Sequence, residues 1–174
     1  MKGFKCILGI VCLLVCTMAQ AAKTAPADSL EANEYDGITI SLLTCGPGEE
    51  VYTLYGHTAI RICDTTRHAD IVVNYGMFSF RQNFFVARFI LGLTDYMIGI
   101  TSFSNFVDEY TYEGRWVYEQ VLNLRQEEKK AIIAAIDENS KPENATYRYN
   151  CFYNNCTTRA RDILTENISG KVGY

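Results

Sequence analysis

Alternating apolar and polar positions predict a set of β-strands after a polar amino-terminal stretch. The segment Ile38–Thr44 alternates, is rich in β-branched residues and ends at the turn-forming run Cys45–Gly48. Thr58–Cys63 and Ile71–Tyr75 are similar runs, and the polar residues between them predict an antiparallel hairpin. Two later segments are also predicted to be strands: Asp95–Thr101 and Arg115–Leu122.

Helical periodicity dominates the last third of the chain. Gln126–Asn139 is the clearest helix, because Ile132, Ile133 and Ile136 share one face. Thr157–Ile168 has a similar apolar face and predicts a second helix. The remaining predictions are short: helices over Gln82–Leu91 and Phe103–Tyr112, one helical turn over Glu49–Tyr55, and an extended aromatic run over Tyr147–Tyr153. Strands and helices mixed in this order predict an α+β domain in which an antiparallel sheet packs with helices.

The amino terminus has the pattern of a secretory signal peptide. Lys2 and Lys5 precede the apolar run Ile7–Met18, which is followed by small residues around Ala21. The apolar run has twelve residues and is too short to span a bilayer. We therefore expect residues 1–21 to be removed on export, residues 22–37 to be a polar leader, and residues 38–174 to form one domain.

Composition and charge exclude several classes of protein. The chain has 174 residues, of which 48% are hydrophobic, so it can bury a core and does not belong to the disordered class. Sixteen basic residues against twenty acidic ones argue against nucleic acid as a partner. Removal of Lys2 and Lys5 with the signal peptide changes the formal net charge from −4 to −6. Apolar contact is therefore a better expectation than attraction to an anionic lipid surface.

Three of the seven cysteines lie within the predicted signal peptide, and four remain: Cys45, Cys63, Cys151 and Cys156. In an exported protein these four could form two disulfides, or one disulfide and a free pair. A domain of this length does not need such crosslinks. The sequence has no CxxC pair and no HExxH motif, so neither a metal site nor a cofactor is predicted.

An apolar stretch between Phe84 and Ile98 admits two interpretations. Arg88, Gly92 and Asp95 interrupt it, so it does not form a membrane span. A helix and a strand of the core are the simpler interpretation. The alternative is an apolar groove or membrane-facing lip able to hold an acyl chain.

Two positions carry the candidate chemistry. Cys156 directly precedes a predicted helix, where unpaired backbone N–H groups and the helix dipole lower the pKa of a thiol and can hold an oxyanion. His57 directly precedes a predicted strand and is a suitable base. Each also has a purely structural interpretation, Cys156 as a small buried hydrophobe and His57 as a hydrogen-bonded loop residue. His68 lies in a polar turn, where we expect it to be solvated.

Several ordered motifs resemble one known family. They are Leu42–Gly48, Tyr55–Ile62, Asn74–Phe78, Tyr118–Leu124, Pro142–Asn144 and Asn155–Arg159. Together they resemble the periplasmic domain of the Lnb-type lipoprotein N-acyltransferases of Bacteroidales over nearly the whole exported chain. A histidine on a strand followed by Asn-Cys at a helix also resembles the circularly permuted NlpC/P60 and lecithin:retinol acyltransferase-like thiol enzymes. The resemblance implies a permuted papain-like core.

The resemblance also implies an activity. Cys156 would be the nucleophile and His57 its base, with Asn74 or Asn155 as candidate third members. The acyl chain of a phospholipid would pass through a thioester to the free amine of a bacterial lipoprotein. The partners would be these two substrates, a membrane surface or a membrane-embedded protein, and the location would be periplasmic, facing the membrane.

The sequence departs from the family in two respects. Family members commonly continue into further soluble sequence and membrane helices, so the resemblance implies that this domain is truncated at its C-terminus, either as a shortened paralogue or as a fragment. Cys151 stands where a bulky apolar residue is expected and could bridge to the proposed nucleophile. Two other functions stay open: a cysteine peptidase or amidase that acts on cell-wall peptide, and a non-catalytic exported paralogue.

Overall fold

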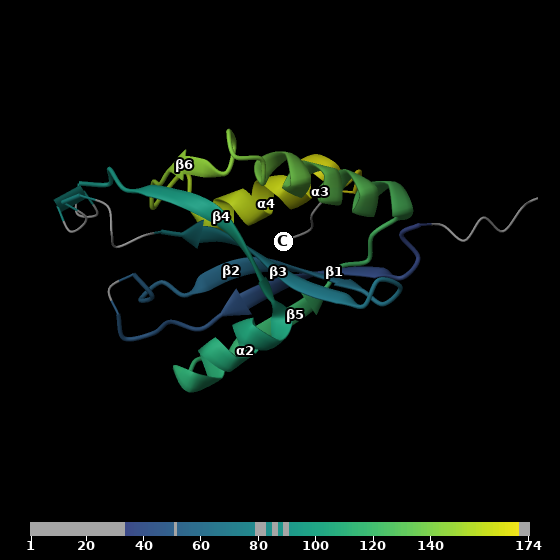
Figure 1. Ribbon diagram of the computed structural model, residues 1–174, viewed down its shortest axis with the longest axis horizontal. Helices are drawn as coiled ribbons and strands as arrows, with labels where there is room; N and C mark the ends of the chain where they lie inside the picture. Colours follow the sequence, from purple (N-terminus) through teal and green to yellow (C-terminus); the bar gives the residue numbers. More distant parts are fainter. Residues whose placement is uncertain (1–33, 51, 79–82, 85–86, 89–90, 171–174) are drawn as a thin grey trace, which may run out of the picture. The chain divides into compact units, whose positions relative to one another are not determined.

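A six-stranded antiparallel sheet is the centre of the domain in the computed structural model (Figure 1). The structure describes residues 34–50, 52–78, 83–84, 87–88 and 91–170. The strand order is β5-β1-β2-β3-β4-β6, and every neighbouring pair is antiparallel. The strands are β1 (Ile38–Cys45), β2 (His57–Asp64), β3 (Ala69–Met77), β4 (Asp95–Ser102), β5 (Val117–Val121) and β6 (Thr146–Arg148). The predicted α+β class with an antiparallel sheet is confirmed, whereas the permuted papain-like core stays a prediction.

Helices cover both faces of this sheet. They are α2 (Phe103–Tyr112), α3 (Gln126–Asn139) and α4 (Cys156–Asn167). Helices α3 and α4 lie on one face, and α2 lies on the other (Figure 1). Their bounds agree closely with the predicted ones, because each helix combines a regular apolar face with a polar first residue or cap.

Two apolar cores follow from this three-layer arrangement. Ile60 and Val73, from the central hairpin, pack with Ile132 of α3 and Ile163 of α4 in the larger core. Alternate residues of the same strands point to the other face and pack with Phe106 of α2. Each fully buried aliphatic side chain contributes about 1.5–3 kcal/mol to the stability of the fold. The central strands, which carry the candidate histidine, are thus held rigidly from both sides.

Two predicted segments have a different structure. Tyr52–Tyr55 forms a turn that ends at Gly56, whose φ of +72° favours glycine, instead of one helical turn. The extended run predicted over Tyr147–Tyr153 is wrong beyond β6. Asn150 accepts hydrogen bonds from the N–H groups of Phe152 (2.9 Å) and Tyr153 (3.0 Å), which bends the chain. This bend returns the backbone to the start of α4.

Parts of the prediction lie outside the described residues. The signal peptide over residues 1–21 does so completely, and of the polar leader only residues 34–37 are described, as a turn before β1. Half of the predicted helix Gln82–Leu91 also lies outside, although Ala87 and Arg88 are helical. Within the part of the chain that the structure covers, no helix is long and apolar enough to cross a bilayer.

Candidate active site

The candidate thiol lies at the first residue of α4, and Asn155 caps this helix. The Asn155 side chain accepts a hydrogen bond from the Thr158 N–H at 2.9 Å and donates one to the Cys151 carbonyl at 2.8 Å. In return, the Thr158 hydroxyl accepts the Asn155 N–H at 2.8 Å. The Asn155 amide is therefore fully used in starting α4 and in holding the preceding turn.

His57 begins β2, and Asn74 of β3 binds its ring. His57 Nε2 lies 3.0 Å from Asn74 Oδ1. Because an amide oxygen only accepts, the ring proton lies on Nε2, and the neutral ring keeps an unprotonated Nδ1. Asn74 pairs with Ala59 in the β2–β3 register, so its side chain lies on the same face as that of His57. Asn74 is buried, which holds the imidazole in one orientation.

The Cys156 thiol meets this imidazole, and its pKa shows the effect. Burial alone would raise the pKa of Cys156. A hydrogen bond with His57, the charge of His57, the Thr58 N–H and the Thr157 hydroxyl outweigh burial and lower the pKa to about 7. Most of this stabilisation comes from β2, across the interface with α4. The thiolate is thus well populated at neutral pH.

Gly76 lies beside both side chains, at ordinary van der Waals distance. A Cβ atom on Gly76 would lie 3.4 Å from His57 Cε1 and 3.6 Å from Cys156 Cβ. The β3–β4 register shifts between Tyr75 and Met77, which places an irregularity of the strand at this glycine. Thr58 adds a contact between the same two elements, since its Oγ1 lies 2.9 Å from Thr157 Oγ1.

Aromatic residues surround the thiol on the side of β4 and β6. Burial raises the pKa values of Tyr96, Tyr147 and Tyr149, and the negative charge of the Cys156 thiolate raises all three further, Tyr149 to about 12. The rings of Tyr96 and Tyr149 stack with centroids 4.1 Å apart. The thiol therefore faces a largely aromatic wall.

The other cysteines differ in environment. Burial raises the pKa of Cys45 to about 11, although a hydrogen bond with Tyr110 acts in the opposite direction, so this thiol stays protonated. Cys63 is half-buried and Cys151 is exposed. All four cysteines of the described region are free thiols, and no disulfide links Cys156 to another residue there. No group of three metal-ligating side chains occurs within the same region.

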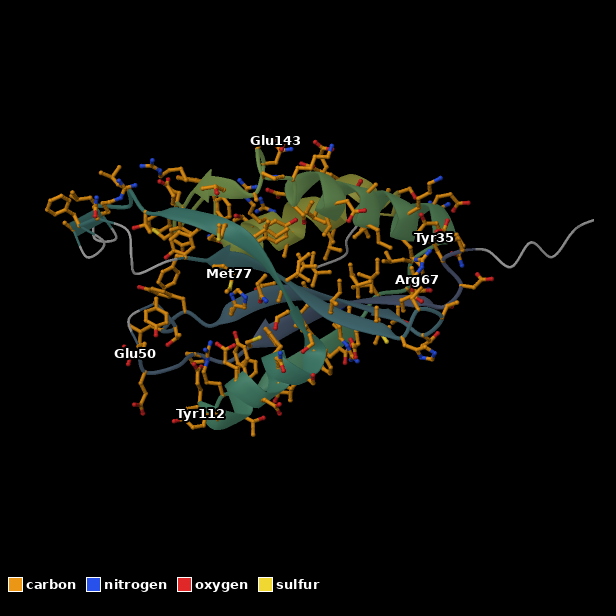
Figure 2. All side chains as sticks on the ribbon, viewed as in Figure 1. Tyr35, Glu50, Arg67, Met77, Tyr112 and Glu143 are labelled. Atoms are coloured by element: carbon orange, nitrogen blue, oxygen red, sulfur yellow. The ribbon has the colours of Figure 1, made fainter. Side chains whose placement is uncertain are left out.

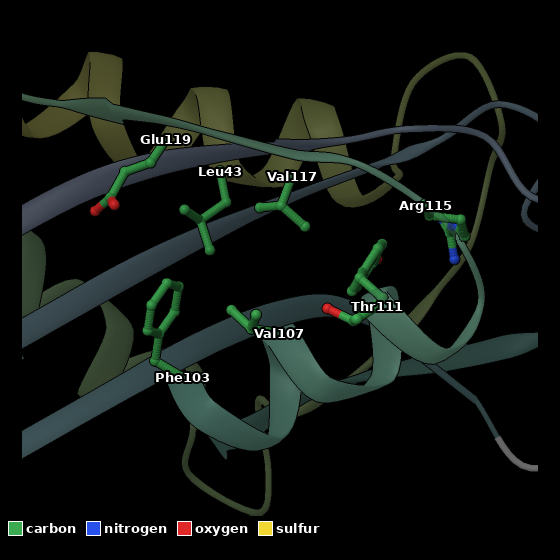
Figure 3. A pocket seen from close by; sticks show the side chains of 8 residues that line it. Leu43, Phe103, Val107, Thr111, Arg115, Val117 and Glu119 are labelled. Atoms are coloured by element: carbon green, nitrogen blue, oxygen red, sulfur yellow. The ribbon is translucent and has the colours of Figure 1, made fainter.

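A cavity of about 240 Å³ lies elsewhere, between α2 and strands β1 and β5. Phe103 and Val107 of α2 point towards Leu43 and Val117 across it (Figure 3). Glu119, one of its lining residues, forms an ion pair with Arg61 (2.9 Å). None of its lining residues belongs to the Cys156–His57–Asn74 group, so this cavity is separate from the candidate site.

Comparison with known families assigns the chain. The family model of the Lnb N-terminal periplasmic domain matches residues 25–173. The chain belongs to this family. No curated protein and no solved structure matches it. As an Lnb N-terminal periplasmic domain, the protein is exported and functions in the periplasm, in the cell envelope. The resemblance seen in the sequence motifs is confirmed at the level of the family.

The Lnb domain brings together three of the four candidate site residues. Cys156, His57 and Asn74 form one group, whereas the Asn155 side chain is directed to the cap of α4. Sequence reasoning did not find Thr58, which acts through its backbone and leaves no residue-type pattern. It also missed Gly76, although a lone glycine inside a strand pattern indicates a bulge or a close approach.

Proposed function

We propose that this Lnb domain is a thiol-dependent acyltransferase with Cys156 as nucleophile, His57 as base and Asn74 as the residue that orients His57. One observation carries the proposal: the Cys156 thiol, whose pKa is lowered to about 7, lies beside the imidazole of His57, and Nε2 of that ring lies 3.0 Å from the amide oxygen of the buried Asn74. A nucleophile, its base and an orienting group in this order are typical of covalent acyl transfer.

The reaction has two balanced steps. In the first, the Cys156 sulfur attacks the carbonyl carbon of a phospholipid ester, a C–S bond forms, and the C–O bond breaks. His57 takes the proton of the Cys156 thiol and, as the imidazolium, gives that proton to the departing glycerol oxygen, so that a lysophospholipid leaves. In the second, the amine of a lipoprotein attacks the thioester and gives its proton to His57. A C–N bond replaces the C–S bond, and the thiol is restored.

The start of α4 supplies donors for the transition state. The first N–H groups of a helix have no partner within the helix, and they stabilise negative charge on the carbonyl oxygen. Asn155 uses its side chain to satisfy only the Thr158 N–H. We assign the oxyanion contact to the backbone N–H groups next to Cys156.

The surroundings of the thiol favour an acyl donor over a cell-wall peptide. A peptidase or amidase needs a polar cleft that binds the backbone of its substrate. Here Tyr96, Tyr147 and Tyr149 lie near Cys156, and Tyr96 and Tyr147 are buried. An alkyl chain gains from contact with aromatic rings, whereas a charged peptide does not.

The test is mass spectrometry of the protein after incubation with a phospholipid of defined acyl chains. Wild type should gain the mass of one acyl group on Cys156, and neutral hydroxylamine should remove it because the linkage is a thioester. Cys156→Ala should gain nothing. Cys151→Ser is the matched control, since it removes an exposed thiol five positions away and should keep the adduct.

Two results would contradict the proposal. One is an acyl adduct that persists in Cys156→Ala, which would place the reactive thiol elsewhere. The other is a wild-type protein without an adduct that instead cleaves cell-wall peptide in a Cys156-dependent way, which would favour the peptidase or amidase.

A further inference from the structure

One end of the sheet carries the whole candidate site. The antiparallel registers place the end of β1, the start of β2, the end of β3 and the start of β4 at the same edge, together with the end of β6. Helix α4 starts at this end, because Thr157 Oγ1 lies 2.9 Å from Thr58 Oγ1 and Cys156 lies beside Gly76. Figure 2 shows Glu50, in the β1–β2 connection, at one extreme of the domain and Arg67, in the β2–β3 turn, at the other.

Exposed apolar side chains gather on the connections at the site end. We define the apolar rim as Leu54, Tyr55, Met77, Phe152 and Tyr153. Tyr55 is 97% exposed, Phe152 78% and Tyr153 82%. These five residues come from the β1–β2 connection, the last position of β3 and the β6–α4 connection, and each lies within five positions of His57, Gly76 or Cys156 along the chain.

The opposite end of the sheet has a different character. The β2–β3 turn is the polar run Thr65–His68. Arg67 forms ion pairs there with Glu34 (2.8 Å) and Asp64 (3.3 Å). The β2–β3 turn therefore differs in character from the connections at the site end, although exposed apolar side chains such as Ile100 and Val121 also occur elsewhere on the sheet. A soluble surface gains nothing from such a cluster, which is typical of a contact surface.

A series of contacts between aromatic rings extends from the β1–β2 connection towards the thiol. Tyr52 meets Phe78 with ring centroids 5.4 Å apart, and Phe78 meets Tyr96 at 5.0 Å. Tyr96 stacks on Tyr149, and the Cys156 thiolate acts on both of their hydroxyls. This aromatic path of ring contacts thus runs from the β1–β2 connection to Tyr149, near the nucleophile.

Among the described residues at this end, charged side chains of both signs occur and do not form a basic patch. Arg88 and Arg148 both bind Asp95, at 3.0 and 2.8 Å. Glu49 and Glu50 precede the rim residues in the β1–β2 connection. Binding here would depend on apolar contact, and tyrosine is a residue that favours the boundary between lipid and water.

We propose that the apolar rim is a membrane-docking surface that seats the Cys156 end of the domain on a zwitterionic phospholipid bilayer. This proposal rests on the proposed acyltransferase function for its choice of partner, because the acyl donor is itself a bilayer lipid. Leu54, Tyr55, Phe152 and Tyr153 enter the interface, and a lipid chain reaches the thiol along the aromatic path. A docked enzyme thereby takes its substrate without carrying the lipid through water.

The experiment compares vesicle binding by two variants of the chain from residue 22 onward, the form expected in the periplasm. The rim variant combines Tyr55→Ser, Phe152→Ser and Tyr153→Ser. The control combines Ile100→Thr and Val121→Thr, which remove exposed apolar surface from β4 and β5 away from the rim. Each protein is floated with phosphatidylcholine–phosphatidylethanolamine vesicles at low and high salt, and its thiol is acylated separately by the water-soluble ester p-nitrophenyl butyrate.

We expect wild type and the control to bind vesicles equally at both salt concentrations. The rim variant should bind at least tenfold more weakly, roughly the effect of losing one large apolar contact. Its reaction with the soluble ester should be unchanged, because no rim residue touches the thiol chemistry. Acylation from vesicle phospholipid should fall in parallel with binding.

Other results separate the two proposals. Vesicle binding that is equal in the rim variant and wild type overturns the docking surface. Absence of binding in all three proteins also overturns it and favours a protein partner on the rim. If the rim variant loses vesicle binding but wild type never reacts with either ester, docking stands and the acyltransferase function fails.

Discussion

Two cysteines near the same histidine show how strongly position controls thiol chemistry. Cys45 pairs with His57 in the β1–β2 register, yet burial raises the pKa of Cys45 to about 11. Burial also acts to raise the pKa of Cys156, but His57, Thr58 and Thr157 lower it to about 7. The difference arises because Cys45 faces the core under α2, whereas Cys156 meets the imidazole and a backbone N–H.

The first prediction concerns the reactivity of Cys156 towards iodoacetamide. In a protein that carries Cys63→Ser and Cys151→Ser, the alkylation rate should rise with pH and reach half its maximum near pH 7, since only the thiolate reacts. His57→Ala should move this midpoint upward, because burial raises the pKa of Cys156 and the imidazole that lowers it is then absent. A midpoint that does not change in His57→Ala would show that the imidazole does not stabilise the thiolate.

The second prediction concerns Asn74, which acts through His57. Asn74→Ala should slow acylation by a soluble ester by about 10²-fold, because the imidazole loses its fixed orientation and tautomer. Asn74→Asp keeps an oxygen acceptor and adds a charge that favours the imidazolium. It should restore part of the rate and move the pH–rate profile to higher pH. A uniform loss in both variants with unchanged pH profiles would indicate a structural role alone.

Sequence reasoning identified the candidate residue types because helix starts and strand ends leave local patterns. It could not choose between Asn74 and Asn155 as the partner of His57, since that choice depends on the hairpin register. The register places Asn74 opposite Ala59, which is two residues after His57 on the same face of the sheet. Asn74 Oδ1 therefore lies 3.0 Å from His57 Nε2.

At the scale of elements, the start of α4 is the critical boundary. Asn155 caps the helix and also donates a hydrogen bond to the Cys151 carbonyl. One residue thus determines where α4 begins and, with it, the position of Cys156. The helix bounds could be predicted because the apolar period and the polar cap agree. The bend at Asn150 could not be predicted. It depends on the Asn150 side chain, which accepts hydrogen bonds from two backbone N–H groups, whereas the aromatic residues around it favour an extended strand.

The third prediction follows from this cap. Asn155→Ala should lower the free energy of unfolding by about 1 kcal/mol, a typical effect of losing an N-cap. Asn155→Ser should restore most of it, since a hydroxyl also accepts from the third helical N–H. Urea unfolding followed by circular dichroism measures both. Full stability in Asn155→Ala together with a complete loss of thiol reactivity would instead support a direct role in the site.

At the scale of the whole domain, Glu128 of α3 joins the helical layer to the segment after α4. It accepts the Ser169 N–H at 2.9 Å and the Ser169 hydroxyl at 2.7 Å. It also accepts the Arg125 N–H at 2.9 Å. These hydrogen bonds lower the pKa of Glu128 to about 2. The contact keeps the end of α4 against α3 and so supports the far end of the helix that carries Cys156.

The fourth prediction is a pH dependence of stability. Because the folded pKa of Glu128 lies below its ordinary value of 4.5, its contribution is fully present above pH 4.5 and is lost as the pH falls towards 2. Glu128→Gln should be less stable at neutral pH and should lose less stability over this range. The exposed neighbour in Glu127→Gln is the control. If the free energies of unfolding of wild type and Glu128→Gln differ by the same amount at every pH from 7 to 2, this assignment is contradicted.

The distribution of the site over the fold has a temporal consequence. His57 and Asn74 belong to the central hairpin, which is packed on both faces, whereas Cys156 is carried by the last helix of the described region. During synthesis and export the base is therefore made long before the nucleophile. Reactivity requires that α4 packs against the sheet, where Ile163 shares a core with Ile60 and Val73. The thiol of a newly made chain thus meets its base only after this last helix is in place.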